Sequence, residues 1–576
     1  MKKFAFLFLL VLVASSLSAQ EFGYPLNLEP WYYIKIKLPL EQKSMDGKWE
    51  LSRVEVNSEE VRDFILSHKG KEIFKPLLAS EGPYELKVRY SWQPEKKYEL
   101  RAYLKNTHTE QEICLEETAF SPPGRGYWNP LWKNYLVLQV AEENGCWRKN
   151  LPLHATFGVL SSCLRSPQEI RVVKAEKKGK DVSYTEIPSQ VYDVIRWEDE
   201  KLLQKKEVDE ETGKAITRYH PTTTLSIAFE AHLRPYEKAS YIVFYNNPSA
   251  GKPSYPTDLS VSGEGLAKTV ENPFYRVVLH QKSGMVHEVY EKSTNTKLEH
   301  KLETNGSIHW NPGVYSPPHS WSHCSDWENP SFSEIKGPVF YSLRRQAPLP
   351  HLQDVQASIT YYFYSGAPFI IMESTLQVND DIFVKALRNA EVVFNREVFT
   401  RAVYRTARGR VKSIDFARSR RHPQHAAVLR PDTPWVCFYD DHRQVGFATL
   451  FLENFTTNIY AGSASSQQPY IYIQHGPWYY LSRAFVYSFG SNNQTRMLPV
   501  RKGSVYFERN AWIPLAFRAR RAVVKTLDEY FSMIKYPLKI MENIETYPES
   551  PRGWLVPILT EPFDEGVKKA IGIRKR

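Results

Sequence analysis

Apolar and polar residues alternate along much of this chain, and this period of two constrains the fold more than any other feature. Aromatic and β-branched residues take the apolar positions, as in Tyr84–Trp92 (YELKVRYSW) and Tyr275–Leu279 (YRVVL). A β-strand turns successive side chains to opposite faces, so the pattern is typical of antiparallel sheets with one solvated face. Similar runs are Trp31–Leu38, Leu136–Val140, Leu225–Phe229, Tyr241–Tyr245 and Ile359–Tyr364. We therefore predict an all-β protein.

Composition supports this class and leaves few places for helices. Aromatic residues make up 14% of the chain and there are 38 prolines, which suits strands joined by turns. The best amphipathic helix is Arg520–Ile534, and Val61–His68 has the pattern of a short helix. We expect one short helix near the C-terminus.

The length of 576 residues is too great for one ordinary domain. A Pro/Gly/Ser-rich stretch, Pro248–Pro256, is typical of a linker, and two charged stretches within 174–214 are typical of a solvated insertion. We predict a multi-domain chain of β-sandwiches. Its parts are 20–155, an N-terminal β-sandwich; 156–250, a second β domain or extension with the charged insertion; 258–517, a large strand-rich domain; and 518–576, a helix and tail.

The first nineteen residues have the pattern of a cleavable secretory signal peptide. Lys2 and Lys3 precede the apolar stretch Phe4–Val13, and small residues lead to Ala19, where we expect cleavage. The apolar stretch is too short to span a bilayer, and no later window is long enough. We expect a secreted or periplasmic protein without a membrane span. Removal of Lys2 and Lys3 lowers the formal net charge from +11 to +9, which still favours an acidic partner, and secretion makes nucleic acid a poor candidate.

The five cysteines match no zinc or redox motif in their spacing. In an oxidising compartment Cys114 could pair with Cys146, or Cys146 with Cys163. The odd number leaves at least one thiol without a partner inside the chain, so we expect hydrophobic cores to hold the fold together in the main, with disulfides optional.

Residues 241–300 present a characteristic order of elements. A strand and a Pro-rich link lead to Thr257-Asp258-Leu259, a turn at Gly263 and Gly265, Asn272, the strand Tyr275–Leu279, a turn at Ser283-Gly284, and Glu288–Lys292. This order resembles the opening of galactose-mutarotase-like β-supersandwich domains, which occur in secreted polysaccharide lyases and some glycoside hydrolases. Tyr361–Phe369 and Tyr479–Tyr487 fit the resemblance, which implies a supersandwich over 258–517.

One Pro-rich, non-periodic segment, 309–329, concentrates aromatic and ionisable residues and is the candidate active site. Trp faces suit the C–H side of a pyranose, and His, Asn and Asp bond its hydroxyls. The candidate acids or bases of the segment are His309, Tyr315, His319 and His323. The candidate sugar contacts are Trp310, Trp321, Asp326 and Trp327.

A lyase acting on a uronic acid needs a base for the proton α to the carboxylate and a group that neutralises the resulting charge. Arg344 is placed among the catalytic candidates and Arg345 among the substrate contacts, because guanidinium binds carboxylate bidentately. A second set of similar composition could face the first. It comprises His475, Trp478, Tyr479, Tyr480 and Arg483.

Two other chemistries remain open for these residues. His319, His323 and Asp326 are ligand types suited to zinc, although Pro317 and Pro318 oppose the helix that would place both imidazoles on one face. A hydrolase would need two opposed carboxylates. Its candidates are Asp326, Glu328, Glu373, Asp440 and Asp441.

The favoured interpretation is a secreted polysaccharide lyase acting on an acidic, uronate-containing glycan. The alternatives are a glycoside hydrolase and a non-catalytic glycan-binding or surface protein. We expect a polysaccharide or oligosaccharide as partner and no cofactor, unless a divalent metal ion serves the zinc alternative. The sequence does not determine the oligomeric state.

Overall fold

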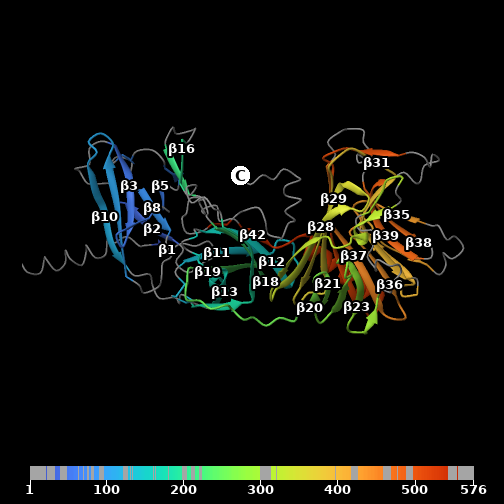
Figure 1. The fold of residues 1–576 in the computed structure, drawn as a ribbon. Coiled ribbons are helices and arrows are strands. Elements are labelled where there is room, and N and C mark those ends of the chain that lie inside the picture. The colour runs from blue at the N-terminus through green and yellow to red at the C-terminus, as the bar shows by residue number, and fades with distance from the viewer. Residues whose placement is uncertain are drawn as a thin grey trace, which may run out of the picture.

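The computed structural model confirms the all-β class, with one α-helix, α2 (Arg520–Lys535), among the described residues. Figure 1 shows that strands of several sheets make up most of the described chain. The structure describes residues 21–22, 33–38, 48–61, 64–68, 71–73, 77–78, 84–89, 97–120, 128–129, 131–132, 134–159, 161, 164–178, 181–196, 204–208, 215–219, 223–298, 313–318, 321–395, 397–416, 426–457, 469–475, 478–487, 497–541 and 554–555.

Two sheets form the N-terminal part of the chain, at the left of Figure 1. The first has the order β1 (Glu21–Phe22), β2 (Tyr33–Leu38), β8 (Tyr84–Arg89), β5 (Phe64–His68), β6 (Lys71–Glu72). The second has the order β10 (Glu112–Phe120), β9 (Tyr98–Asn106), β3 (Lys48–Val56), β4 (Glu59–Val61), with β7 (Leu77–Leu78) beside β3. Residues from both sheets share one hydrophobic core. Alternate residues of β9 are buried, as the period of two predicts.

Two further sheets form a middle sandwich. One has the order β14 (Asp181–Ile187), β13 (Arg171–Lys178), β19 (Lys238–Tyr245), β11 (Asn134–Ala141), β42 (Lys539–Met541). The other has the order β15 (Ser189–Arg196), β18 (Thr223–Leu233), β12 (Arg148–Val159), β43 (Trp554–Leu555). The charged region contributes the hairpin β16 (Gln204–Val208) and β17 (Ala215–Tyr219). A short 3-10 helix, η3 (Pro167–Glu169), precedes β13.

Three larger sheets and a short pair follow. A five-stranded sheet has the order β20 (Ser260–Glu264), β21 (Ala267–Glu271), β22 (Tyr275–Leu279), β23 (Val286–Glu291), β24 (Thr296–Lys297). A six-stranded sheet has the order β26 (Trp321–His323), β25 (Gly313–Tyr315), β32 (Ala386–Asn395), β39 (Trp478–Tyr487), β38 (Tyr470–His475), β35 (Ala426–Leu429). A nine-stranded sheet has the order β27 (Ser331–Lys336), β28 (Phe340–Leu349), β29 (Leu352–Tyr364), β30 (Ile370–Val378), β41 (Val505–Ala516), β37 (Val445–Thr457), β36 (Trp435–Asp440), β33 (Arg401–Arg405), β34 (Val411–Asp415). β31 (Ile382–Val384) pairs with β40 (Leu498–Val500), and a 3-10 helix, η5 (Cys324–Asp326), follows β26.

The nine-stranded sheet is buried on both faces. On β30, Ile370 and Met372 face a core shared with the five- and six-stranded sheets, whereas Ile371 faces a core shared with the middle sandwich. The second core also contains Leu527 of α2. The middle sandwich and the nine-stranded sheet therefore pack together through one continuous hydrophobic cluster.

The chain returns to the middle sandwich after the large domain. β42 adds to β11, with Ala141 opposite Lys539, and β43 adds to β12, with Gly158 opposite Trp554. Along the chain, helix α2 follows β41 of the nine-stranded sheet and precedes β42. It packs into the core that the nine-stranded sheet shares with the middle sandwich.

Asn272, one of the residues in the resemblance to supersandwich domains, fixes the five-stranded sheet to the nine-stranded one. Its Nδ2 donates to the carbonyl oxygens of Tyr364 and Ala367 at 3.2 and 2.8 Å, and its Oδ1 accepts from the amides of Phe274 and Tyr275. The side chain is buried, and both ends of its amide are satisfied. Its role is structural.

The structure corrects two predictions. Val61–His68 is not a helix, because Phe64–His68 forms strand β5 and pairs with β8. Neither disulfide that we considered is present, since Cys146 carries a free thiol. The predicted signal peptide, residues 1–19, lies outside the described residues. Among the described residues no helix combines the length and apolar character that a bilayer crossing requires.

Candidate functional site

The register of the six-stranded sheet brings charged and aromatic residues together. Gly313 of β25 pairs with His323 of β26 on one side and with Arg388 of β32 on the other. Arg388 also pairs with Ala484 of β39. Residues directly opposite across antiparallel strands share a face of the sheet. His323 and Arg388 therefore share one face, and the two residues that flank Arg388 are small.

This face is turned away from the hydrophobic core. On β38, Ile471 and Ile473 belong to the core, so Tyr472 between them points to the opposite side. Tyr472 accepts a hydrogen bond from Arg388 Nη1, which places both residues on that side. We call it the polar face of the six-stranded sheet, and define it by Trp321, His323, Arg388, Glu391, Tyr472 and Ser482. Ser482 belongs to it because its strand register places it opposite Tyr472.

Trp321 provides a flat surface at the edge of the polar face. Its indole is partly exposed, and the Arg388 guanidinium carbon lies 3.6 Å from the ring centroid. The ring of His323 is nearly parallel to it, at 15° with 5.7 Å between centroids. A guanidinium over an indole is a favourable cation–π arrangement. The contact holds the guanidinium of Arg388 over the Trp321 ring.

A buried ion pair lies at the centre of the polar face. Arg388 Nη1 is 2.8 Å from Glu391 Oε2, and the two side chains are 5% and 0% exposed. The Tyr472 hydroxyl donates to the same carboxylate oxygen at 3.5 Å. Burial, and then the Glu391 charge, raise the pKa of Tyr472. Tyr472 is therefore protonated at neutral pH and able to donate a hydrogen bond.

His323 and Asp326 form a carboxylate–imidazole pair at the edge of this cluster. His323 Nδ1 lies 3.2 Å from Asp326 Oδ2, and the Asp326 side chain is 33% exposed. Burial lowers the pKa of His323 to about 4 against the opposing effect of Asp326, and Arg388 lowers it further. At neutral pH the imidazole is uncharged. With Nδ1–H donating to the carboxylate, the lone pair lies on Nε2.

Arg344 and Arg345 do not act together, because neighbours on a strand face opposite sides. Arg344 donates to Ser358 at 3.3 Å. Arg345 is fully buried, donates to the Ser283 carbonyl at 2.9 Å and lies 4.7 Å from the centroid of the Tyr361 ring. Both belong to β28 of the nine-stranded sheet, not to the polar face. Arg345 is held within the core.

Three other predicted residues lie at different depths. Trp327 is buried, and its Nε1–H donates to the Pro348 carbonyl at 2.8 Å. Arg483 is buried on the core side of β39, where its Nε donates to Glu508 at 2.8 Å. Tyr480 is partly exposed on β39, two residues before Ser482, so it shares the polar face.

Several predicted residues cannot be placed in this arrangement. His309, Trp310 and His319 lie outside the described residues. Tyr315, His475 and Trp478 are described in their backbone alone, as ends of strands β25, β38 and β39. Of the three residues of the zinc alternative, the structure therefore describes two, His323 and Asp326. Among the described residues no group of three potential ligands could hold a metal ion.

The carboxylates considered for a hydrolase are dispersed. Glu328 is exposed and pairs with Lys282 at 2.9 Å. Glu373 is buried beside Arg509 and accepts from Tyr362, on the side of the nine-stranded sheet that faces the middle sandwich. The other two candidates also have local partners. Asp440 accepts hydrogen bonds from Thr400 and from the amide of Arg443, and Asp441 forms an ion pair with Arg401. Asp326 alone among them lies beside the polar face.

Sequence reasoning missed Arg388, Glu391 and Tyr472. Arg388 and Glu391 lie in ALRNAEVVFN, a strand sequence in which charged residues interrupt an apolar run. Glu391 lies within a β-bulge, where the register of β32 shifts between Asn389 and Val392. Charged residues inside a strongly apolar strand are rarely buried without a partner. That signal was available in the sequence, although it does not name the partner.

Comparisons with known proteins complete the description of the chain. No family model matches it, and no curated protein matches it. Among solved structures, an α-mannosidase from Enterococcus faecalis is similar with a TM-score of 0.43 and 8% identity, over 70% of this chain and 45% of the mannosidase. This chain thus spans less than half of that enzyme.

Two further neighbours differ from each other in kind. A galactose mutarotase-like protein from Lactobacillus casei has a TM-score of 0.28 and 8% identity, over 44% of this chain and 100% of that protein. YidC from Thermotoga maritima has a TM-score of 0.22 and 8% identity, over 48% of this chain and 56% of that protein. At these scores none of the neighbours transfers an activity to this chain.

Proposed function

We propose that this protein is an exported enzyme that cleaves a polysaccharide at the polar face of the six-stranded sheet. The observation that carries the proposal is the convergence of a neutral imidazole, a guanidinium and an indole on one sheet face. Trp321 and His323 of β26 have nearly parallel rings, and the guanidinium of Arg388 from β32 lies over the indole of Trp321. Such a set combines acid–base, anion-binding and ring-stacking groups, which is what cleavage of a charged sugar requires.

The finer proposal is β-elimination on a uronic acid. In this reaction a base takes the proton α to the carboxylate, the electron pair forms a C=C bond, and the glycosidic C–O bond breaks with its oxygen taking a proton. We assign the base to Nε2 of His323. Asp326 is a positioning residue, because it holds the proton on Nδ1.

Arg388 supplies the charge that the uronate carboxylate needs. It stays protonated and presents its N–H groups as a planar fork. A bound carboxylate would offset the positive charge beside His323, so the pKa of His323 would rise towards the working range of a general base. The buried, protonated Tyr472 is the candidate acid for the leaving oxygen, since its hydroxyl already contacts Arg388 and Glu391.

A glycoside hydrolase is the second candidate, favoured by one observation. Asp326 and Glu391 are both carboxylates of the same cluster, each in contact with a residue that also contacts Trp321. Paired carboxylates on either side of a glycosidic bond are what a hydrolase needs. The buried ion pair with Arg388 keeps Glu391 from serving as a free base, so we place elimination first.

The experiment is a cleavage assay with two readouts. The chain without residues 1–19 is mixed with polygalacturonate, alginate, hyaluronan and, as a neutral reference, mannan. Elimination gives a conjugated product that absorbs at about 235 nm, whereas hydrolysis gives new reducing ends without that absorbance. Absorbance that rises with an acidic polysaccharide, and not with mannan, supports the proposal. New reducing ends without the absorbance would show hydrolysis instead of elimination. The absence of both signals on every polymer would overturn both candidate functions.

A further inference from the structure

Three large aromatic side chains are exposed at one end of the middle sandwich. Trp147 is 60% exposed, Tyr236 73% and Tyr536 49%. Trp147 lies in the loop from β11 to β12, Tyr236 in the loop from β18 to β19, and Tyr536 between α2 and β42. Ala141 at the end of β11 pairs with Lys238 and Lys539, so all three loops meet at the same end.

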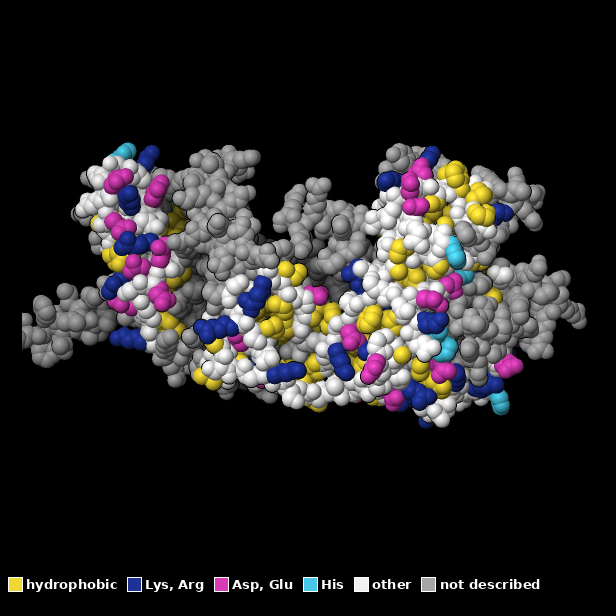
Figure 2. Space-filling model, in the orientation of Figure 1, with side chains coloured by type: hydrophobic (Ala, Val, Ile, Leu, Met, Phe, Trp, Pro, Cys, Tyr) yellow, Lys and Arg dark blue, Asp and Glu magenta, His cyan; other side chains and the backbone are white. Residues whose placement is uncertain are grey.

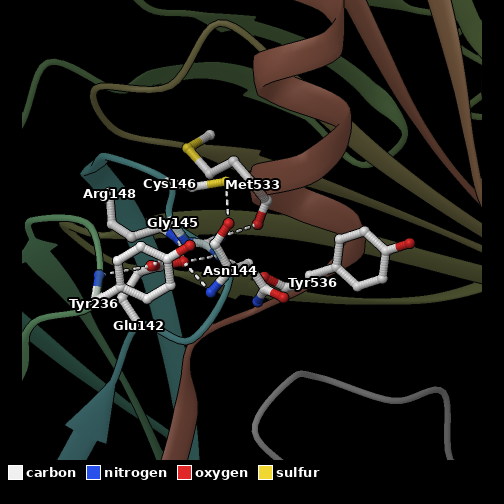
Figure 3. A network of polar contacts seen from close by, with 8 residues as sticks. All are labelled: Glu142, Asn144, Gly145, Cys146, Arg148, Tyr236, Met533 and Tyr536. Atoms are coloured by element: carbon white, nitrogen blue, oxygen red, sulfur yellow. Dashed lines mark hydrogen bonds and ion pairs between the residues drawn. The ribbon is translucent and has the colours of Figure 1, made fainter.

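A buried charge pair holds two of these loops together. The Glu142 carboxylate accepts hydrogen bonds from the amides of Asn144 and Gly145, at 3.0 and 2.8 Å, and from the amide of Tyr236, at 3.0 Å. Arg148 Nη2 lies 2.8 Å from the same carboxylate, and both side chains are fully buried (Figure 3). Although burial opposes it, these contacts lower the pKa of Glu142 to about 2.

The same guanidinium also holds the third loop. Arg148 donates to the carbonyl oxygens of Met533 and Tyr536, at the C-terminal end of α2. Figure 3 shows Tyr236 and Tyr536 on opposite sides of this network. The buried pair of Glu142 and Arg148 thus holds the backbone of the three segments that carry the exposed rings, so these segments are ordered before any ligand binds.

Tyr236 combines a strained backbone with a mostly exposed side chain. Its φ is +60°, in the left-handed region that tyrosine rarely adopts, and its ring is mostly exposed. The ring lies so close to Gly145 that a Cβ there would be 2.7 Å from the tyrosine oxygen. A strained, exposed aromatic residue fits a binding role better than a structural one.

The size and spacing of the surface point to a sugar. An aromatic side chain offers about 150–250 Å² of surface, so three half-exposed rings offer on the order of 400 Å². A stable protein interface needs about 800 Å² from each partner. The exposed polar residues Glu143 and Asn144 lie in the same loop as Trp147, and Figure 3 shows Asn144 between Tyr236 and Tyr536. Flat apolar faces separated by polar groups match successive pyranose rings.

Cations beside the rings favour an acidic sugar. The ammonium of Lys149 lies 5.9 Å from the centroid of the Trp147 ring and is exposed. Arg234 is exposed in the same loop as Tyr236. The carboxylate of Glu237, also in that loop, accepts a hydrogen bond from the amide of Arg234. Figure 2 shows Lys and Arg side chains interspersed with hydrophobic ones over the middle sandwich.

We propose that Trp147, Tyr236 and Tyr536 form a second sugar-binding surface, separate from the polar face, that holds an acidic polysaccharide chain. The proposal rests on the proposed polysaccharide-directed function, for which this surface would keep the polymer close to the enzyme. It predicts binding through stacking on the rings, with Lys149 and Arg234 pairing with carboxylates of the polymer.

The test measures dissociation constants on immobilised polygalacturonate, alginate and hyaluronan, with dextran as the neutral reference. The variant combines Trp147→Ala with Tyr236→Asn, because asparagine tolerates a positive φ and the fold is kept. Leu131→Ala is the matched control, since Leu131 is 64% exposed at the opposite end of the same sandwich. We expect the double variant to bind the acidic polymer about tenfold more weakly or worse, and the control to bind like the intact chain.

Three results would overturn the inference in different ways. Equal binding by the intact chain and the double variant would refute the binding role of this surface and leave the proposed enzymatic function unaffected. No binding to any of the polymers, together with no cleavage, would refute both the binding surface and the proposed enzymatic function. A lower molecular mass of the double variant in sedimentation would show that the surface joins copies of the chain.

Discussion

The buried imidazole of His154 makes the stability of the protein depend on pH. His154 lies on β12 between the middle sandwich and the nine-stranded sheet, with its Nδ1 2.8 Å from the Tyr192 hydroxyl. The rings of Phe340 and Tyr364 also contact it. Burial, and secondarily the Arg509 charge, lower the pKa of His154 to about 3 from its ordinary value of 6.5.

The sign and size of the effect follow from proton linkage. The unfolded chain takes up a proton at His154 below pH 6.5, whereas the folded chain does not until about pH 3. The stabilisation is therefore complete above pH 6.5 and is lost as pH falls towards 3. Each pH unit in this window corresponds to about 1.4 kcal/mol, so the loss between pH 7 and pH 5 is about 2 kcal/mol.

The perturbation that isolates this group is His154→Gln, which keeps a polar partner for Tyr192 and cannot titrate. The assay is urea unfolding followed by tryptophan fluorescence, at pH 7 and at pH 5, for both proteins. His323 also has a lowered pKa, but it is present in both and cancels in the comparison. We expect the intact protein to lose about 2 kcal/mol more than the variant. Parallel losses would refute the assignment of a neutral, buried His154.

Three further outcomes follow from the structure. Arg148→Met leaves the buried Glu142 charge without its ion partner, and we expect a loss of about 3–5 kcal/mol in urea unfolding, against less than about 1 kcal/mol for the exposed Lys525→Met control. Asn272→Ala removes four hydrogen bonds, and we expect about 2 kcal/mol or more of lost stability, measured in the same way; an unchanged midpoint would contradict its anchoring role. Asp326→Asn removes a partner that raises the pKa of His323, so the acidic limb of the cleavage profile should move to lower pH while the rate falls; a rate loss without that shift would contradict the positioning role.

The strands with one solvated face were predictable from sequence, and those buried on both faces were less so. Tyr275–Leu279 was predicted from its alternation and forms β22 with the same bounds. β41 is buried at ten consecutive residues because cores lie on both sides of it, so its sequence does not alternate. Val61–His68 misled because a short apolar run does not distinguish a helix from a strand.

The candidate site was predictable in part, because its residues meet through strand register. Trp321, His323 and Asp326 belong to one short segment, so composition pointed to them. Arg388 joins them only because Gly313 pairs with both His323 and Arg388, and pairing between distant strands cannot be read from local sequence. Arg344 and Arg345 were chosen because guanidinium binds carboxylate. Both lie on β28 of the nine-stranded sheet, and alternation along the strand sends their side chains to opposite faces.

The most direct test of the account is the cleavage rate after the ion pair of the polar face is replaced. Combining Arg388→Met with Glu391→Leu removes both buried charges together, and such replacements commonly keep or increase stability. On the acidic polysaccharide that the intact chain cleaves fastest, we predict a fall in initial rate of about 100-fold or more, with an unchanged unfolding midpoint. A folded double variant that cleaves at the intact rate would contradict the placement of the active site on this face.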